Sequence, residues 1–324
     1  MIRVCMLPSD SARHDGVSRY RREVGRFLAG QIEFTDENDC DIIHLVDAHR
    51  YDPAWRRAKT SGKKLVVTVH DLIPEIFGLR GLVYEGVNER KEVLAAADRI
   101  VTVSKKTKDD LVSRYGVDPV RIDIIYNGVE KTDVTHDAQG SDRNARVAGD
   151  YILWVGRRAG YKNFFWFVHA VAPLLWRQGM RVVCTGGQPF GRKERLWMAV
   201  HCVYGRFSLV SPDDAELGCL YAGARCLVMP SRYEGFGLPV IEAMSYGCPV
   251  VLPHDHVFPE IAGDAAAWYA ANDSVAFRHE VRRVEEGAFR EELIRRGRAR
   301  AAGFSWQRGA EELLRVYREM LGLQ

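Results

Sequence analysis

The sequence predicts an α/β protein with two Rossmann-like domains, each of which alternates strands and helices around a mostly parallel sheet. A chain of 324 residues is longer than a single hydrophobic core usually supports. Apolar runs of strand length alternate with segments of helix length in both halves. The polar segment Thr135–Gly149 lacks an apolar period, so it is the predicted interdomain linker. We therefore expect a first domain at residues 1–140, a second at 141–308 and a terminal helix at 309–324.

The composition narrows the class of protein. A content of 47% hydrophobic and 27% charged residues is typical of soluble globular proteins, and a net charge of +3 is too small to indicate a nucleic-acid partner. The seven cysteines form no C-x-x-C pair and mostly lie in apolar runs, which predicts buried, reduced thiols. No signal peptide or run long enough to span a membrane is evident. These features predict a cytoplasmic protein.

Five apolar runs in the first half are predicted strands, and one of them ends beside a candidate site residue. The runs are Ile2–Leu7, Asp41–Val46, Lys64–Val69, Asp98–Ser104 and Arg121–Val129. His70 follows the third run, and the carboxyl ends of parallel strands are where open α/β sheets bind ligands. His70 is therefore a candidate functional residue, with a core or capping histidine as the alternative.

A helix predicted at Arg19–Leu28 carries a basic stripe. Arg19, Arg22 and Arg26 recur at spacings of three and four residues, which places them on one helical face. The stripe is either a solvated face or a contact surface for anionic lipid head groups or a lipid pyrophosphate. A second helix, with Ser104 as its N-cap, is predicted at Lys105–Tyr115.

The second half repeats the alternation of strands and helices. Its predicted strands are Tyr151–Val155, Arg181–Gly187, Phe207–Val210 and Cys226–Met229. The aromatic rings of a helix at Asn163–Trp176, including Phe164 to Phe167, are expected in the core. Ser211 and Ser274 are the expected N-caps of later helices, and a last helix is expected at Arg308–Leu321.

The segment Pro230–Val251 holds the strongest functional signal. It is predicted to run from a strand through a tight loop into a helix, with Pro239 in the first turn. Gly235 and Gly237 allow a ligand to approach the backbone, and the free N–H groups of a helix N-terminus attract phosphate. Glu234 and Glu242 are carboxylates that suit sugar hydroxyls. Together these groups predict a site for a sugar nucleotide.

The pair Glu234 and Glu242, with seven residues between, resembles the paired-glutamate motif of family-4 retaining glycosyltransferases. These enzymes have the GT-B fold, in which two Rossmann-like domains face each other across a cleft and a terminal helix packs back on the first domain. The resemblance spans the chain and is densest at residues 211–251. It implies a retaining hexosyltransferase that acts in cell-surface polysaccharide or lipopolysaccharide synthesis.

The resemblance also implies roles for individual residues. Glu234 would bind the donor sugar beside the anomeric carbon, Glu242 the ribose hydroxyls, and Arg157 and Lys162 the diphosphate, although Arg158 competes with Arg157. His70 would stand near the reacting sugar. The catalytic set is thus Glu234, His70, Arg157 and Lys162. The donor-binding set is Gly16, Arg157, Lys162, Gly186, Glu234, Gly235, Phe236, Gly237, Leu238 and Glu242.

The same resemblance implies a nucleotide-sugar donor, with GDP-mannose as the first candidate and a UDP-sugar next, and a saccharide or lipid-linked saccharide acceptor. No metal cofactor is expected, because two cations can stabilise the leaving diphosphate. Asp39 and Asp41 satisfy a D-x-D pattern that we interpret as chance, and His254 and His256 lack further ligands. The alternatives are a GT-B phosphorylase and a catalytically inactive nucleotide-sugar-binding subunit. A dinucleotide dehydrogenase is disfavoured because no G-x-G-x-x-G follows the first strand.

Overall fold

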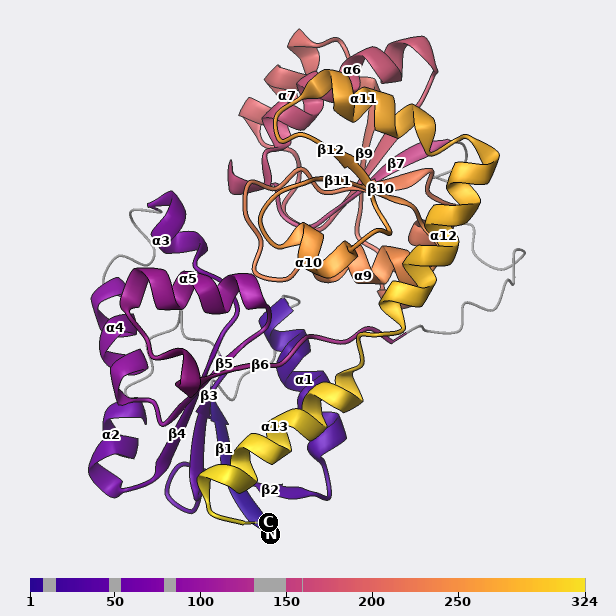
Figure 1. Cartoon of the computed structure of the whole chain (residues 1–324). Coiled ribbons are helices and arrows are strands. Elements are labelled where there is room, and N and C mark those ends of the chain that lie inside the picture. The colour runs from indigo at the N-terminus through magenta and orange to yellow at the C-terminus, as the bar shows by residue number, and fades with distance from the viewer. Residues whose placement is uncertain (8–15, 47–53, 79–85, 131–149, 159, 324) are drawn as a thin grey trace. The chain divides into compact units, whose positions relative to one another are not determined.

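The computed structural model describes residues 1–7, 16–46, 54–78, 86–130, 150–158 and 160–323. These residues form two compact units, one comprising Met1–Gly128 with Phe304–Gln324 and the other Val129–Gly303. Figure 1 shows a separate sheet in each unit. The predicted linker, residues 135–149, lies outside the described residues.

The first unit is built on a six-stranded parallel sheet in the order β2-β1-β3-β4-β5-β6. Its strands are β1 (Ile2–Leu7), β2 (Ile32–Phe34), β3 (Ile42–Leu45), β4 (Lys64–Val69), β5 (Arg99–Thr102) and β6 (Ile122–Ile124). Its helices are α1 (Gly16–Leu28), α2 (Ala54–Ser61), α3 (Ile73–Phe77), α4 (Gly86–Ala96), α5 (Lys105–Tyr115) and α13 (Trp306–Met320). The predicted N-cap of α5 is confirmed, since the Ser104 side chain accepts a hydrogen bond from the Thr107 backbone N–H.

Alternation along β4 assigns the two faces of this sheet. Leu65, Val67 and Val69 belong to a core that also contains residues of α2, α4 and α5. Thr68 points to the other face, where Tyr20 of α1 lies within 3.5 Å of its hydroxyl. Helix α13 packs against α1 on that face (Figure 1). The described part of the C-terminal helix therefore completes the first unit.

Close backbone packing fixes the start of this C-terminal helix. A Cβ atom added to Gly128 would lie 2.0 Å from the backbone nitrogen of Trp306, so only glycine fits there. The Ser305 hydroxyl accepts a hydrogen bond from Arg308 N–H as the N-cap of α13. The helix thus begins two residues before the predicted Arg308.

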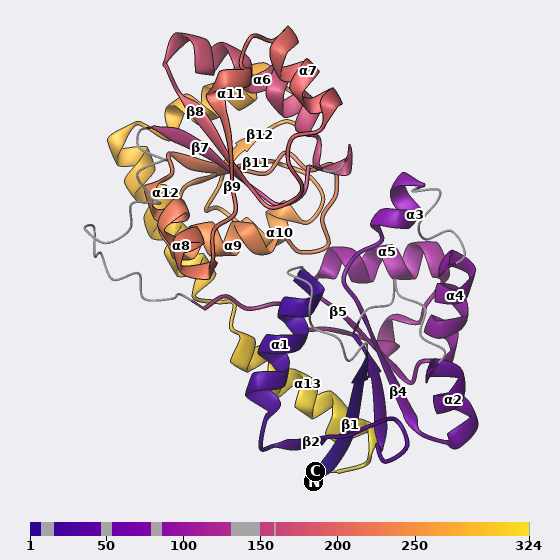
Figure 2. The same ribbon diagram turned by 180° about the vertical axis from the view of Figure 1, so that it is seen from behind.

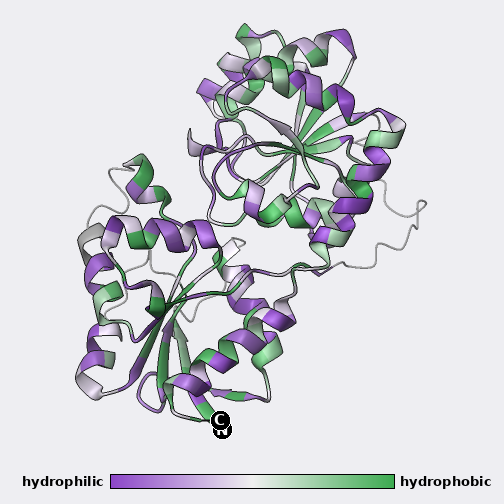
Figure 3. Cartoon of the chain, in the orientation of Figure 1, coloured by the Kyte–Doolittle hydropathy of each residue, from purple (hydrophilic) through white to green (hydrophobic). Residues whose placement is uncertain are grey.

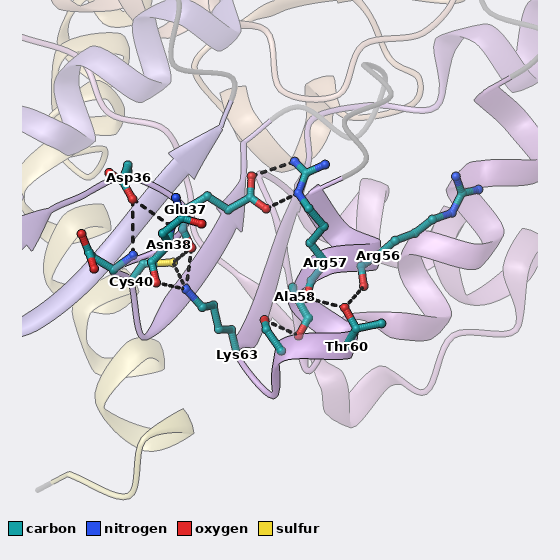
Figure 4. A network of polar contacts seen from close by, with 11 residues as sticks. Asp36, Glu37, Asn38, Cys40, Arg56, Arg57, Ala58, Thr60 and Lys63 are labelled. Carbon is teal, nitrogen blue, oxygen red and sulfur yellow. Dashed lines mark hydrogen bonds and ion pairs between the residues drawn. The ribbon is translucent and has the colours of Figure 1, made fainter.

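A polar network holds the loop before β3 to the end of α2 (Figure 4). The Arg57 guanidinium binds the Glu37 carboxylate through two nitrogens, and the Lys63 ammonium donates to the Glu37 and Asn38 carbonyls. This loop precedes β3 and therefore lies at the amino-terminal edge of a parallel sheet. Ligand sites of such sheets lie at the opposite edge, so the network stabilises the fold.

The second unit has a six-stranded parallel sheet in the order β12-β11-β10-β7-β8-β9. Its strands are β7 (Tyr151–Val155), β8 (Arg181–Thr185), β9 (Phe207–Val210), β10 (Cys226–Val228), β11 (Val250–Pro253) and β12 (Ala267–Tyr269). Its helices are α6 (Phe164–Arg177), α7 (Arg192–Val200), α8 (Asp214–Gly223), α9 (Leu238–Ser245), α10 (Phe258–Ala262), α11 (Ser274–Arg283) and α12 (Gly287–Ala301).

Helices cover both faces of the second sheet. Figure 2 shows α6, α7 and α11 on one side and α8, α9 and α10 on the other. The strands are mainly hydrophobic in Figure 3, as expected for strands covered on both faces. Among the described residues, no helix is long and apolar enough to cross a membrane.

Three local predictions in the second half are wrong. Asp213, rather than Ser211, caps α8, because Asp213 and Glu216 exchange hydrogen bonds in a capping box. Asp273, rather than Ser274, caps α11 by accepting bonds from two backbone N–H groups. Phe165 is 40% exposed, so the aromatic run at the start of α6 does not lie wholly in the core. The cysteine prediction holds for five thiols, whereas Cys219 is half-buried and Cys202 exposed.

Candidate active site

Three neighbouring strands of the second sheet bring the predicted donor loops together. β7 pairs with β10 on one side and β8 on the other, and all three run parallel. Their carboxyl ends therefore meet at one edge, where the strand order reverses direction around β7. Open α/β sheets bind ligands at such a switch point. The loops that follow these strands contain Arg157 and Lys162, Gly186, and Glu234 to Gly237.

Glycines allow two of these loops to approach closely. Gly156 and Gly186 both have positive φ, at 110° and 82°. A Cβ atom on Gly186 would lie 3.2 Å from the Cα of Gly156, and one on Gly156 would lie 3.6 Å from the Lys162 ammonium. Gly186 therefore acts by leaving room for the loop after β7, which carries the predicted cations.

Lys162 and Glu234 form an ion pair at the centre of this edge. The Lys162 Nζ lies 2.7 Å from Glu234 Oε1, and their side chains are 12% and 10% exposed. A backbone hydrogen bond of 2.8 Å from Arg232 N–H to the Tyr161 carbonyl joins the same two loops. The pairing places a cation that suits phosphate directly beside a carboxylate that suits sugar hydroxyls.

The two neighbouring arginines have different environments. Arg158 binds Glu194 at 2.8 Å, donates to the Gly186 and Gln188 carbonyls, and lies 4.7 Å from the centroid of the Phe190 ring. Its side chain is only 4% exposed. Arg157 is exposed, and no hydrogen bond or ion pair joins its side chain to another described residue. Arg157 is therefore available to a ligand, whereas Arg158 stabilises the loop.

The N-terminus of α9 completes this edge. Glu234, Gly235, Phe236 and Gly237 are buried, and Leu238 begins the helix. Gly237 has a φ of 93°, which favours glycine, and it turns the chain so that the first backbone N–H groups of α9 are presented at the loop. The described geometry thus combines backbone donors, a lysine and a carboxylate within one loop cluster.

Glu242 lies one turn into α9 and has a partner that the sequence analysis missed. The Tyr221 hydroxyl on α8 donates a 2.6 Å hydrogen bond to Glu242 Oε2, and Glu242 is 6% exposed. Tyr221 stacks on Tyr246 with ring centroids 5.9 Å apart. No local sequence pattern marks Tyr221, because its contact with Glu242 depends on how α8 packs against α9.

In the first unit, His70 lies at the carboxyl end of β4 as predicted. Its Nε2 lies 2.8 Å from the Val46 carbonyl oxygen, which can only accept, so this nitrogen carries the proton. The Tyr20 ring meets the His70 ring edge-on at a centroid distance of 5.0 Å. Gly16 is the exposed first residue of α1, and the residues before it lie outside the described part. His70 is therefore held in a defined orientation by β3 and α1.

Comparison with known proteins decides the family. A profile described as Glycosyltransferase Family 4 matches residues 12–133, and one described as Glycosyl transferases group 1 matches residues 149–286. A D-inositol 3-phosphate glycosyltransferase of Salinispora tropica is 30% identical over 90% of this chain and 67% of its own length. The chain belongs to glycosyltransferase family 4.

Two further likenesses extend this result. The O-antigen chain mannosyltransferase B of Escherichia coli is 28% identical to this glycosyltransferase over 86% of the chain and 67% of that protein. The crystal structure of HepE from Anabaena in complex with UDP-glucose superposes with a TM-score of 0.78 at 15% identity, covering 99% of this chain and 100% of that one. The predicted GT-B fold is confirmed.

The glycosyltransferase also has a buried polar chain in its first unit that the sequence did not reveal. His44 is fully buried, with its Nδ1 2.6 Å from the Tyr317 hydroxyl and its Nε2 2.7 Å from the Thr68 hydroxyl. Thr68 also lies 3.5 Å from the hydroxyl of Tyr20, which packs on His70. Burial, with a smaller effect of the charge on His70, lowers the pKa of His44 to about 3. The ring is therefore neutral near pH 7.

Part of the positive charge of the predicted basic stripe on α1 is neutralised by an acidic residue of the same helix. Glu23 lies between Arg22 and Arg26 and pairs with both, at 3.1 and 3.2 Å. The arginine side chains are 53% and 52% exposed. The stripe is thus partly neutralised within α1, which favours the solvated-face interpretation.

Asp41 of the D-x-D pattern has a structural role. Asp41 Oδ1 binds the Arg3 guanidinium at 2.7 Å, and this hydrogen bond is the main cause of the lowered pKa of Asp41. Asp255 similarly lies 3.3 Å from His256. Within the described ranges, no group of three histidine, cysteine or acidic residues has the arrangement of a metal site.

Proposed function

We propose that this glycosyltransferase transfers a hexose, with retention of anomeric configuration, from a nucleoside-diphosphate sugar to a saccharide or lipid-linked saccharide during cell-surface polysaccharide synthesis. The observation that carries the proposal is the Lys162–Glu234 ion pair beside the N-terminus of α9. GDP-mannose is the first candidate donor, because one relative is named a mannosyltransferase of O-antigen chains. UDP-glucose or another UDP-sugar is next, because HepE has been crystallised with UDP-glucose.

Charge develops on the diphosphate as the glycosidic bond breaks, and three groups of this chain can stabilise it. Lys162 supplies a half-buried point charge, and the exposed Arg157 supplies a planar fork. The backbone N–H groups at Gly237 and Leu238 supply a helix N-terminus. Since these groups take the place of a divalent ion, we propose that turnover needs no metal cofactor.

The two carboxylates bind the two sugars of the donor, the transferred hexose and the ribose. Glu234 receives hydroxyls of the transferred hexose near the anomeric carbon, while Lys162 beside it contacts the leaving diphosphate. Glu242 receives the ribose hydroxyls, with Tyr221 holding one of its oxygens. His70, oriented by Val46 and Tyr20, stands near the reacting sugar. No enzyme nucleophile is required if the acceptor attacks the face that the diphosphate leaves.

Donor identity is tested first by thermal shift of the full chain with UDP, GDP, ADP and TDP, each with and without EDTA. A ligand at about a hundredfold its Kd stabilises by about 2.7 kcal/mol. We expect GDP, or failing that UDP, to raise the melting temperature, and EDTA to leave the shift unchanged. A metal requirement would contradict the metal-free proposal.

Mechanism is tested next by NMR of the product formed from the best GDP- or UDP-sugar. An α-linked product from an α-configured donor, with release of the nucleoside diphosphate, supports a retaining transferase. Turnover that depends on inorganic phosphate instead would identify a phosphorylase. Nucleotide binding without hydrolysis or transfer would identify a binding subunit.

A further inference from the structure

Exposed apolar side chains concentrate on one side of the second unit. Among the described residues, twelve large hydrophobic side chains are exposed, and half of them lie in α6, α7 and the turn that follows. These are Phe165, Trp176, Leu196, Trp197, Val200 and Tyr204, with exposed fractions between 37% and 65%. We call these six residues the α6–α7 surface. Scattered exposed apolar residues are ordinary, but a cluster of this kind marks an interaction site.

Contacts link three members of the α6–α7 surface, Phe165, Trp176 and Trp197, directly or through His201. The Phe165 and Trp197 rings meet at a centroid distance of 6.0 Å, and Trp197 lies 5.0 Å from the ring of His201. The Trp176 indole N–H donates to the His201 carbonyl at 3.3 Å. Leu196, Trp197 and Val200 follow the three- and four-residue spacing that places side chains on one helical face.

The chain around this surface is strongly cationic. Between Tyr151 and Arg206 the sequence contains a single acidic residue, Glu194, and the Arg158 guanidinium already binds its carboxylate. Arg177, Arg192, Lys193, Arg195 and Arg206 are exposed around the apolar side chains. An apolar face surrounded by unneutralised basic residues complements a surface with negative charge above a hydrophobic interior.

The two tryptophans of the α6–α7 surface already have hydrogen-bond acceptors for their indole N–H groups. Trp197 donates its indole N–H to the Phe165 carbonyl at 2.8 Å, and Trp176 donates to His201, so neither indole needs another acceptor. Their exposed ring edges can enter the boundary between head groups and acyl chains without leaving a donor unpaired. We propose that the α6–α7 surface docks this glycosyltransferase on an anionic lipid bilayer.

A second copy of this chain or a nucleic acid would fit the α6–α7 surface less well than a lipid bilayer. A two-fold contact between copies would place the same basic residues of both chains against each other, and like charges repel. A nucleic acid would use the basic residues but leave Leu196 and Val200 without a role. The proposal goes beyond the proposed reaction, since it concerns a surface that contains none of the predicted donor residues.

The test is flotation of the full chain with vesicles of equal parts phosphatidylglycerol and phosphatidylcholine, and with phosphatidylcholine alone. We expect binding to the anionic vesicles that falls with added salt. The double variant Leu196→Gln, Val200→Gln should reduce the partition coefficient about tenfold or more. Lys193→Gln and Arg195→Gln should each reduce it about fivefold.

Matched controls separate this surface from general effects. Val275→Gln and Arg282→Gln change exposed residues of α11 in the same unit and should alter vesicle binding by less than about twofold. The nucleotide-induced thermal shift should be the same in every variant, which shows that the fold is intact. The triple variant Arg19→Gln, Arg22→Gln, Arg26→Gln tests the α1 stripe separately.

Three results would overturn the proposal. The first is equal vesicle binding by the Leu196/Val200 double variant and the Val275 control. The second is loss of binding only in the α1 triple variant. The third is an unbound wild-type protein whose concentration-dependent sedimentation is relieved by the Leu196/Val200 double variant, which would assign the surface to contacts between copies.

Discussion

The two sheets differ in the polar contacts near the carboxyl ends of their strands, which are ion pairs in the second unit and hydrogen bonds between neutral side chains in the first. In the second unit, charged pairs join the loop after β7 to the loop after β10, through Lys162 and Glu234, and to the first turn of α7, through Arg158 and Glu194. In the first unit, β3 and β4 contribute a neutral chain in which His44 joins Tyr317 to Thr68. A residue of a partly buried ion pair can exchange its partner for an ionic ligand. A buried series of hydrogen bonds between neutral side chains can only hold neighbouring groups in place.

The charged pairs of the second unit are suited to ligand binding, whereas the neutral hydrogen bonds of the first unit stabilise the fold around His70. The second unit holds the charged side chains that we propose bind the diphosphate, and Arg157 has no partner among the described side chains. The first unit holds His70 through Val46 and Tyr20, and Tyr20 in turn approaches Thr68. Variants in the second unit should therefore change affinity and rate, and variants in the neutral chain should change stability.

The largest effect is expected from Glu234→Gln. Loss of the charge that we propose meets the sugar in the transition state should lower kcat by about 10²–10³-fold. Affinity for the free nucleoside diphosphate should be kept, because the variant leaves Lys162 in place. Steady-state rates and calorimetry measure the two quantities. Glu291→Gln, an exposed change on α12, is the control. A large loss of diphosphate affinity with unchanged kcat would reverse the role given to Glu234.

The next largest effect is expected from Arg158, and its neighbour Arg157 in the loop after β7 provides the comparison. Arg158→Gln removes one partner of a buried ion pair and should lower the free energy of unfolding by about 3 kcal/mol. Arg157→Gln should leave stability within about 0.5 kcal/mol and weaken diphosphate binding. Urea unfolding and calorimetry on both variants measure these effects. Equal destabilisation by the two changes would refute the division between support and binding.

A smaller effect is expected at the other glutamate. Glu242→Ala should weaken binding of the bare nucleoside diphosphate by roughly 1.5–3 kcal/mol, because it removes a charged acceptor of unreactive hydroxyls. Tyr221→Phe removes only the hydroxyl that holds Glu242 and should cost about 1 kcal/mol or less. Titration calorimetry compares the variants. Unchanged affinity in Glu242→Ala would remove this residue from the donor site.

The last effect, the smallest for a change of one pH unit, concerns the hydrogen-bonded residues His44, Tyr317 and Thr68. The pKa of His44 is about 3 in the folded protein and about 6.5 when unfolded, so between these values the unfolded state binds the extra proton. The stabilisation is complete above pH 6.5 and is lost as the pH falls towards 3, by at most about 1.4 kcal/mol per pH unit.

Hydrogen exchange of the β3 amides, compared at equal pH with His44→Gln, isolates this contribution. The wild-type protein should lose protection more steeply with acid than the variant. Tyr317→Phe keeps the imidazole and should retain the steep dependence at lower overall protection. Parallel profiles for the wild type and His44→Gln would show that His44 does not titrate as its burial indicates.

The sequence by itself determined the alternation of strands and helices and the bounds of several strands, but it did not locate β2, β12, α2 or α4. Apolar runs located β1, β4, β7 and β9 within their observed bounds, because the signals for an element lie within the element. The same reasoning placed His70 at a strand end and Glu234 to Leu238 at a helix start. Where two capping residues competed, as at Ser211 and Asp213, the choice required the hydrogen bonds themselves.

Only the tertiary structure decided which side chains meet. Lys162 and Glu234 are 72 residues apart, and His44 and Tyr317 are 273 apart. Their contacts follow from the placement of β7 beside β10 and of α13 beside α1. Spacing likewise could not choose between Arg157 and Arg158, which depended on Glu194 lying within reach of one guanidinium. Local periodicity contains no information on such pairings, because they arise from the strand order and from the packing of helices on the sheets.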